Sequence, residues 1–135
     1  SDRARELTAR GRKQARAVAR WLGKRLPDDC RILVSPAARA QQTAAALDRR
    51  LETDPRVDVG ASASDVLAAA GWPDGGGTVI VVGHQPTLGQ AAALALTGTA
   101  AAWPVKKGAV WWLRRRVRDG EAEIVLRGVI GPDLV

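Results

Sequence analysis

Hydrophobic and polar positions follow a helical period over the first thirty residues of the chain. From Thr8 onward, basic side chains occupy one side of the segment and apolar ones the other. The apolar side consists of Ala15, Val18, Ala19, Leu22 and Leu26. This pattern predicts an amphipathic helix with Thr8 as its N-cap and an end before Pro27. Residues 31–34 (Arg-Ile-Leu-Val) then indicate a short buried strand.

The middle of the chain contains both predicted helices and a predicted strand. After a turn at Ser35-Pro36, a second helix is predicted over about 37–51, because apolar residues recur there at helical spacing. Residues 57–59 suggest a further short strand. A brief helix is predicted at about 64–70, followed by a Pro- and Gly-rich loop.

The clearest strand covers residues 78–82 and leads through Gly83-His84-Gln85-Pro86 into a third helix over about 87–96. Continuous apolar strands of this kind are typical of a parallel sheet covered on both faces. Residues 108–117 and 122–127, separated by Arg118-Asp119-Gly120, predict a hairpin. The chain is therefore expected to form an α/β sheet with an antiparallel pair near one edge.

The composition limits the number of domains and the class of protein. A chain of 135 residues and 14.3 kDa with 46% hydrophobic residues predicts a single domain over residues 1–135. No apolar run approaches the roughly 18 residues that span a bilayer. One cysteine, Cys30, excludes an internal disulfide and favours a reducing compartment, the cytoplasm. The sequence contains no methionine, so we expect it to begin after the natural start.

The net charge of +7 is concentrated at one end of the chain. Residues 1–50 carry 13 basic and 5 acidic side chains, whereas residues 51–135 carry 8 and 9. A nucleic-acid footprint is the less favoured interpretation, because no aromatic residues alternate with these charges along the sequence. The basic helix could instead attract an acidic protein substrate. The five tryptophans are expected to fill the core or cover edges.

Two strand ends carry candidate chemistry. In open α/β sheets, sites lie beyond the carboxyl ends of the strands. Arg39 follows the first strand, where its guanidinium could bind a phosphoryl group or carboxylate, although a solvated surface arginine is the simpler reading. His84, the only histidine, follows the 78–82 strand and could transfer a proton or stabilise charge, although a structural histidine is an alternative.

Other chemistries find little support. One histidine and one cysteine provide no zinc set, and no metal or cofactor is expected. The chain has no Walker A loop and no G-x-G-x-x-G motif. Ser35 lacks the G-x-S-x-G elbow of a serine hydrolase.

Three segments together resemble the histidine phosphatase superfamily, the phosphoglycerate mutase-like fold, and within it the small SixA-type phosphohistidine phosphatases. The segments are Ser1-Asp2 with Arg5-x-Leu7-Thr8-x-x-Gly11 and Gln14-Ala15; Val34-Ser35-Pro36-x-x-Arg39-Ala40-x-Gln42-Thr43-Ala44; and Val82-Gly83-His84-x-Pro86. The resemblance implies a three-layer α/β/α fold and metal-independent phosphoryl transfer through a phosphohistidine intermediate. It implies that Arg39 and His84 bind the phosphoryl group, with Gln85 lining the pocket. The substrate would be a phosphohistidine protein or a small phosphoester.

The chain departs from this family pattern at the nucleophile. The family's Arg-His-Gly or Arg-His-Ala motif, at the end of a first strand, would lie upstream of Ser1. Either that strand is outside the sequence, which the missing methionine favours, or the chain is a non-catalytic relative that recognises phosphate. Its absence is expected to leave neighbouring backbone groups of the sheet unpaired.

A second departure concerns the proton donor. Larger relatives carry an acidic residue after the third strand, and residues 60–64 contain no carboxylate, although Asp58 and Asp65 flank them. This favours phosphohistidine, whose leaving group is better than that of an alkyl phosphate.

Overall fold

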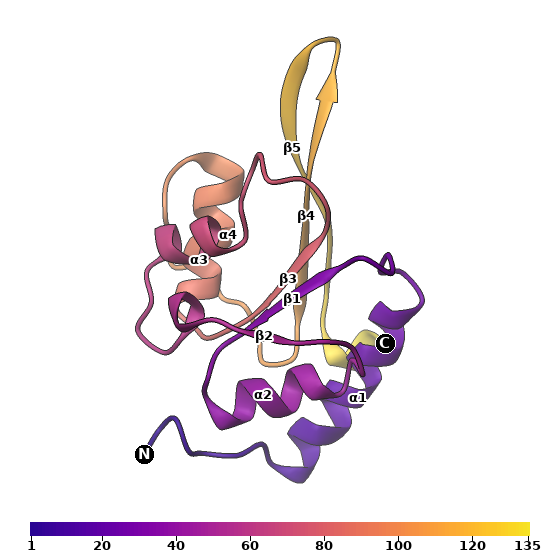
Figure 1. Cartoon of the computed structure of the whole chain (residues 1–135), viewed down its shortest axis with the longest axis vertical. Helices are drawn as coiled ribbons and strands as arrows, with labels where there is room; N and C mark the ends of the chain where they lie inside the picture. The colour runs from indigo at the N-terminus through magenta and orange to yellow at the C-terminus, as the bar shows by residue number, and fades with distance from the viewer.

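The computed structural model describes all 135 residues, and helices cover both faces of a small parallel sheet (Figure 1). The sheet contains three strands in the order β2-β1-β3. Their bounds are Arg31–Val34 for β1, Glu52–Thr53 for β2 and Val79–Val82 for β3. The helices are α1 (Ala9–Gly23), α2 (Ala38–Ala45), α3 (Ala63–Ala69) and α4 (Thr87–Thr97), with 3-10 turns at Pro55–Val57 and Pro132–Leu134. This architecture confirms the predicted three-layer α/β/α class.

Two apolar clusters hold the layers together. On one face of the sheet, Leu33 packs with residues of α3 and α4; on the other, Ile32 and Val34 pack with Ala40 and Ala44 of α2. The three apolar residues of β1 are at most 1% exposed. Burial of each such side chain stabilises the fold by roughly 1.5–3 kcal/mol. The continuous apolar run therefore produces a strand buried on both faces, as the sequence predicts.

Strand β1 lies at the centre of the sheet. It pairs in parallel with β2 on one side and with β3 on the other, where Leu33 lies opposite Val81. β1 and β3 pair directly along their whole length, whereas β3 has no strand partner on its other side, which leaves one backbone edge of the sheet unpaired as expected. This parallel pairing brings the carboxyl ends of both strands to one edge.

The second helix is shorter than its pattern predicts. α2 ends at Ala45 rather than near residue 51, and Asp48 adopts a positive φ of 52° just beyond it. Leu47 and Leu51 still pack against the second cluster, so burial rather than helical continuation explains their spacing. The strand expected at 57–59 is wrong as well: strand pairing occurs at Glu52–Thr53.

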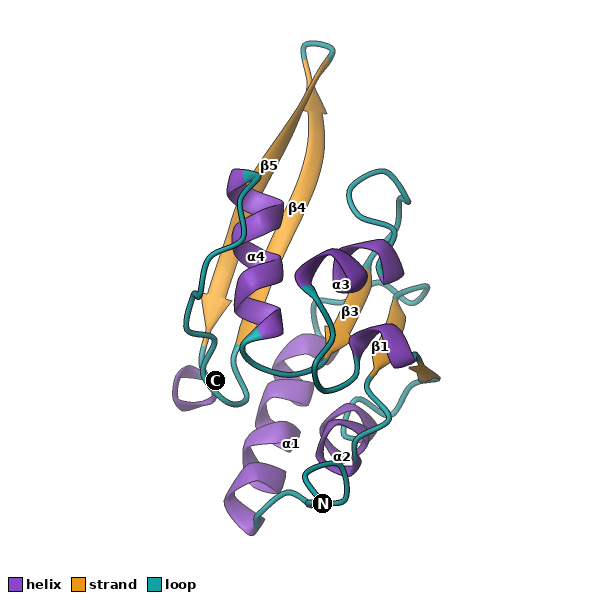
Figure 2. Cartoon of the chain, turned by 90° about the vertical axis from the view of Figure 1, so that its left-hand side faces the viewer, coloured by secondary structure: helices purple, strands orange, loops and turns teal.

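The predicted hairpin forms, but outside the parallel sheet. β4 (Val110–Arg118) and β5 (Glu121–Ile130) make a separate two-stranded sheet that extends beyond the body of the protein (Figure 2). Asp119 and Gly120, with φ of 51° and 79°, form its turn. Half-buried tryptophans attach its base: Trp112 meets Trp21 of α1 edge to face, and Trp111 meets Trp103.

No helix is long and apolar enough to cross a membrane.

Candidate functional site

The two strand ends singled out in the sequence meet at one edge of the sheet. Arg39 Nη2 lies 3.2 Å from His84 Nδ1, although 45 residues separate them in the chain. Arg39 belongs to the first turn of α2, and His84 follows β3 directly. Two further side chains join them, Ser35 and Asp58. We call these four residues the rim.

The protonation of His84 follows from its neighbours. A guanidinium only donates hydrogen bonds, so the Nδ1 atom facing Arg39 must accept one. The neutral ring then carries its proton on Nε2, 2.7 Å from Ser35 Oγ. The Ser35 hydroxyl is left to donate to Asp58 Oδ1 at 3.3 Å. The rim is thus a directed chain of hydrogen bonds from Arg39 through His84 and Ser35 to Asp58.

Ser35 is the buried centre of this chain. Its side chain is 0% exposed, and Oγ also accepts from the Ala37 backbone N–H at 3.1 Å. Asp58 ends the chain as an acceptor held from three sides, by Ser35, by the Val59 N–H at 2.7 Å and by Arg3 at 2.9 Å. A fully partnered network of this kind fixes the orientation of the histidine ring.

The N-terminal segment supplies counter-charges to the rim. Asp2 accepts hydrogen bonds from Arg39 at both its backbone carbonyl, 2.6 Å away, and its carboxylate, 3.1 Å away. The Arg3 carbonyl accepts from the Ala38 N–H at the start of α2. Arg39 is therefore paired with a carboxylate, and its side chain remains 21% exposed. An anion reaching Arg39 from solvent competes with Asp2.

Both titratable groups of the rim have shifted pKa values. Burial lowers the pKa of His84, and the Arg39 guanidinium lowers it further, against the opposing charges of Asp58 and Asp2. Burial alone would raise the pKa of Asp58, but the Val59 N–H, Arg3 and Ser35 outweigh it and lower that pKa. The resting rim thus pairs a neutral imidazole with an ionised carboxylate.

Gln85 is engaged elsewhere. Its amide donates to the Trp103 carbonyl at 3.0 Å and accepts from the Gly89 N–H at 2.7 Å. It forms no hydrogen bond with Arg39 or His84, so the structure brings together two of the three candidate residues. The expectation that Gln85 lines the pocket remains a prediction.

Sequence reasoning did not assign the supporting residues Asp2, Ser35 and Asp58 to the site. Ser35 directly follows a buried strand at the same edge as His84, which is the signal that could have identified it. Asp58 carried no such signal, because it reaches the rim from the turn after Pro55–Val57, where the sequence suggested a strand.

The rim can bind an anion with fixed donors. Arg39 offers a guanidinium fork, and His84 becomes a second donor when its Nδ1 is protonated. A dianion at this place would favour that protonation, because it adds negative charge beside the ring. No group of three or more His, Cys, Asp or Glu side chains is arranged to hold a metal ion.

Comparisons with known proteins show what the chain is similar to. The profile of the histidine phosphatase superfamily (branch 1) matches residues 3–62, which include Arg39, Ser35 and Asp58. No curated protein sequence matches the chain.

Solved structures provide the wider match. A protein histidine phosphatase SixA in complex with tungstate is 25% identical, with a TM-score of 0.79 over 98% of this chain and 88% of that one. A protein assigned as phosphohistidine phosphatase SixA from Nakamurella multipartitia is 26% identical, with a TM-score of 0.74 over 98% and 87%. A counterpart from Agrobacterium tumefaciens, 21% identical with a TM-score of 0.74 over 98% and 87%, shares the fold. The chain is therefore similar to the histidine phosphatase superfamily over residues 3–62, and its structural neighbours are SixA phosphohistidine phosphatases.

Proposed function

We propose that this protein is a phosphohistidine phosphatase that removes phosphoryl groups from histidine side chains of other proteins. The observation that carries the proposal is the 3.2 Å contact between Arg39 and His84 at the carboxyl ends of two adjacent parallel strands. A charged fork beside a protonatable ring suits a phosphoryl dianion. The tungstate bound by a structural neighbour is likewise a tetrahedral oxyanion. In this proposal the protein acts without metal, as one domain over residues 1–135, in the cytoplasm that its single cysteine favours.

The reaction divides into two displacements at phosphorus. A histidine upstream of residue 1 attacks the phosphoryl group, a new N–P bond forms, and the N–P bond to the substrate histidine breaks. The substrate imidazole already carries a proton on its other ring nitrogen, so it leaves as the neutral ring and needs no proton from the site. Water then attacks the phosphoenzyme and releases inorganic phosphate, which restores the nucleophile.

The residues of this chain stabilise charge in both steps. The phosphoryl oxygens take the place of the Asp2 carboxylate as acceptors from Arg39, and His84 donates from Nδ1 once it is protonated. Ser35 holds the opposite nitrogen of His84 and thereby aims the ring. Asp58 is ionised and takes part in three interactions, so it acts as an anchor for Ser35 rather than as a proton donor. A good leaving group such as imidazole fits a site without a dedicated acid.

A phosphate-recognising protein without turnover is the second candidate. It is favoured by one observation, that the only histidine of the chain occupies the charge-stabilising position. The residues that precede Ser1 distinguish the two: an Arg-His pair followed by Gly or Ala supports the enzyme.

Phosphate release from a histidine-phosphorylated protein tests the proposal on the full-length protein. Replacement of either donor, Arg39→Ala or His84→Ala, is expected to lower kcat/KM by about 10²–10³-fold. Arg10→Ala, an exposed change on α1, serves as the control and should leave the rate unchanged. Full activity in both rim variants overturns the assignment. Retention of the phosphoprotein without phosphate release indicates the binding protein. Turnover of small phosphoesters alone would redirect the substrate class.

A further inference from the structure

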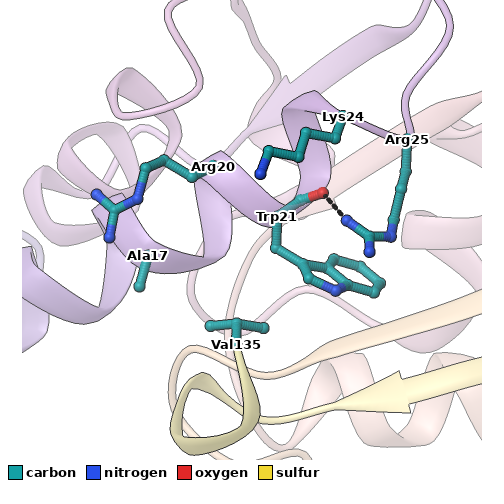
Figure 3. A pocket seen from close by; sticks show the side chains of 6 residues that line it. All are labelled: Ala17, Arg20, Trp21, Lys24, Arg25 and Val135. Carbon is teal, nitrogen blue, oxygen red and sulfur yellow. Dashed lines mark hydrogen bonds between the residues drawn. The ribbon is translucent and has the colours of Figure 1, made fainter.

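A second positive region lies at the far end of α1, where that helix meets the base of the hairpin. Two adjoining shallow pockets of about 230 and 220 Å³ share Trp21 and Arg25, and Figure 3 shows the first of them. Basic side chains surround them: Arg20, Lys24, Arg25 and Arg127. No aspartate or glutamate side chain lines either pocket. We call these joined pockets the basic groove.

The cations of the basic groove lack carboxylate partners. None of the four takes part in a salt bridge, whereas eight ion pairs neutralise charges elsewhere on the surface. The helix dipole accounts for basic residues near the end of α1, but Arg127 comes from β5. Charge from two elements therefore converges on one depression, which is complementary to an acidic partner.

The floor of the basic groove consists of tryptophan rings that arginine side chains already cover. Arg25 stacks over Trp21 at 4.2 Å from the ring centre, and Arg127 stacks over Trp112 at 4.4 Å. Arg25 is fixed further by a hydrogen bond from Nη1 to the Trp21 carbonyl at 2.7 Å (Figure 3). A nucleic-acid base could stack on these rings only by displacing a guanidinium, so the arrangement favours carboxylates over bases.

Apolar side chains border these charges. Val129 and Val135 line the two pockets and are 46% and 40% exposed. An occupant that matches the groove thus combines several carboxylates with an apolar side chain. The two features together describe an acidic segment of a protein.

The position of the groove relative to the rim indicates which protein would bind there. Leu7 hydrogen-bonds to Gln42 of α2, which anchors the start of α1 close to the rim. Trp21 lies about 20 Å further along the helix axis. An occupant of the groove thus lies well away from the rim, so it would belong to a protein substrate rather than to a small phosphoester.

We infer that the basic groove docks an acidic, apolar-bearing segment of the phosphoprotein substrate. The inference rests on the proposed function for the identity of the partner, while the groove itself is independent of the rim. Docking would increase the affinity for the protein substrate and leave the chemical step unchanged.

Steady-state kinetics of the full-length protein test this docking. The substrates are a chemically phosphorylated acidic protein and free phosphohistidine. The triple variant Arg20→Gln/Lys24→Gln/Arg127→Gln is expected to lower kcat/KM for the protein about tenfold through KM, since loss of about 1.4 kcal/mol of binding is a factor of ten. Its kcat/KM for free phosphohistidine should not change.

A matched control separates docking from net charge. Arg10→Gln/Lys13→Gln/Arg114→Gln removes the same charge from exposed positions outside the groove, and should leave both substrates unaffected. An equal loss in the control, an equal loss for both substrates, or no loss in the groove variant overturns the inference. Thermal unfolding establishes that both variants are folded.

Direct binding distinguishes failure of the docking site from failure of the proposed function. If the wild-type protein releases no phosphate from either substrate, the proposed function fails and the groove is tested alone. The probe is a fluorescent peptide of glutamates around one leucine, compared with its lysine counterpart and with oligothymidylate. Binding of the glutamate peptide that the groove variant weakens about tenfold supports the inference. Tighter binding of oligothymidylate, or no binding of the glutamate peptide, overturns it.

Discussion

The rim and the basic groove are both built around arginine, but they hold it differently. At the rim, Arg39 contacts Asp2 and His84 and is only 21% exposed, next to a network of partly buried hydrogen bonds. In the groove, the four cations are exposed and have no carboxylate partner. A guanidinium fixed by its neighbours is preorganised for one ligand geometry, whereas exposed charges attract many acidic surfaces over a distance. The rim therefore suits chemistry, and the groove suits docking.

The same conservative substitution should separate the two regions. Lysine keeps the charge of arginine but loses its planar fork. Arg39→Lys is expected to lower kcat/KM for phosphohistidine by about 10²-fold, because a donor to the transition state is lost. Arg20→Lys in the groove should preserve the rate on protein and small substrates alike. The measurement is the rate of phosphate release by both variants. Equal effects at the two positions would contradict the distinction between a preorganised rim and a docking groove.

Two glycine substitutions compare the packing under Gln85, the residue next to His84, with the packing beside the groove. A Cβ atom at Gly89, under the Gln85 side chain, would lie 1.9 Å from the Trp103 carbonyl oxygen, whereas one at Gly23, beside the groove, meets nothing within 4 Å. Gly89→Ala is expected to lower the free energy of unfolding by about 3 kcal/mol. Gly23→Ala should raise it by about 0.5 kcal/mol, because alanine favours the helix. Urea denaturation measures both. Similar stabilities in the two variants would show that the packing around Gln85 is looser than described.

Removal of one buried hydroxyl tests the network that supports His84. Ser35→Ala leaves the Ala37 N–H without its acceptor and separates His84 from Asp58. We expect a loss of about 1–3 kcal/mol in the free energy of unfolding. Ser64→Ala, at an exposed position of α3, is the matched control and should change stability little. The account also expects Ser35→Ala to reduce kcat/KM and shift its pH profile. A loss of stability alone, with an unchanged profile, would restrict Ser35 to a structural role.

The smallest expected effect concerns the pH dependence of stability. Burial, followed by Arg39, lowers the pKa of His84, so the unfolded chain binds the proton more readily than the folded protein does. The free energy of unfolding should then fall as the pH drops below the ordinary histidine value of about 6.5, and level off below the folded pKa. Urea denaturation in this range should show the decrease in the wild type and not in His84→Gln. An identical decrease in both proteins would place its origin elsewhere.

Much of the fold follows from local pattern. The apolar run at β1, the β-branched run at β3 and the Asp-Gly turn of the hairpin each satisfy a strong local preference. α2 is shorter than predicted because Leu47 and Leu51, beyond its end, keep a helical spacing only in order to pack against the core. The spacing of apolar residues alone cannot distinguish such burial from a helix that continues.

The candidate site is predictable in part for a similar reason. Arg39 and His84 follow strands, and parallel pairing then forces them together. Asp58 and Asp2 reach the rim from loops whose paths depend on the complete fold. The basic groove is hidden in the sequence because Trp21 and Arg25 come from α1 and its end, Trp112 from β4 and Arg127 from β5, and they meet only in space.

Proton NMR of the single imidazole tests the central claim, that Arg39 and His84 form one anion-binding site. Because the chain contains one histidine, its ring resonances report on His84 alone. The account predicts a pKa below the ordinary value in the free protein, an increase when inorganic phosphate is added, and an increase in Arg39→Gln without phosphate. A ring that titrates at its ordinary value and responds to neither phosphate nor the substitution would contradict it.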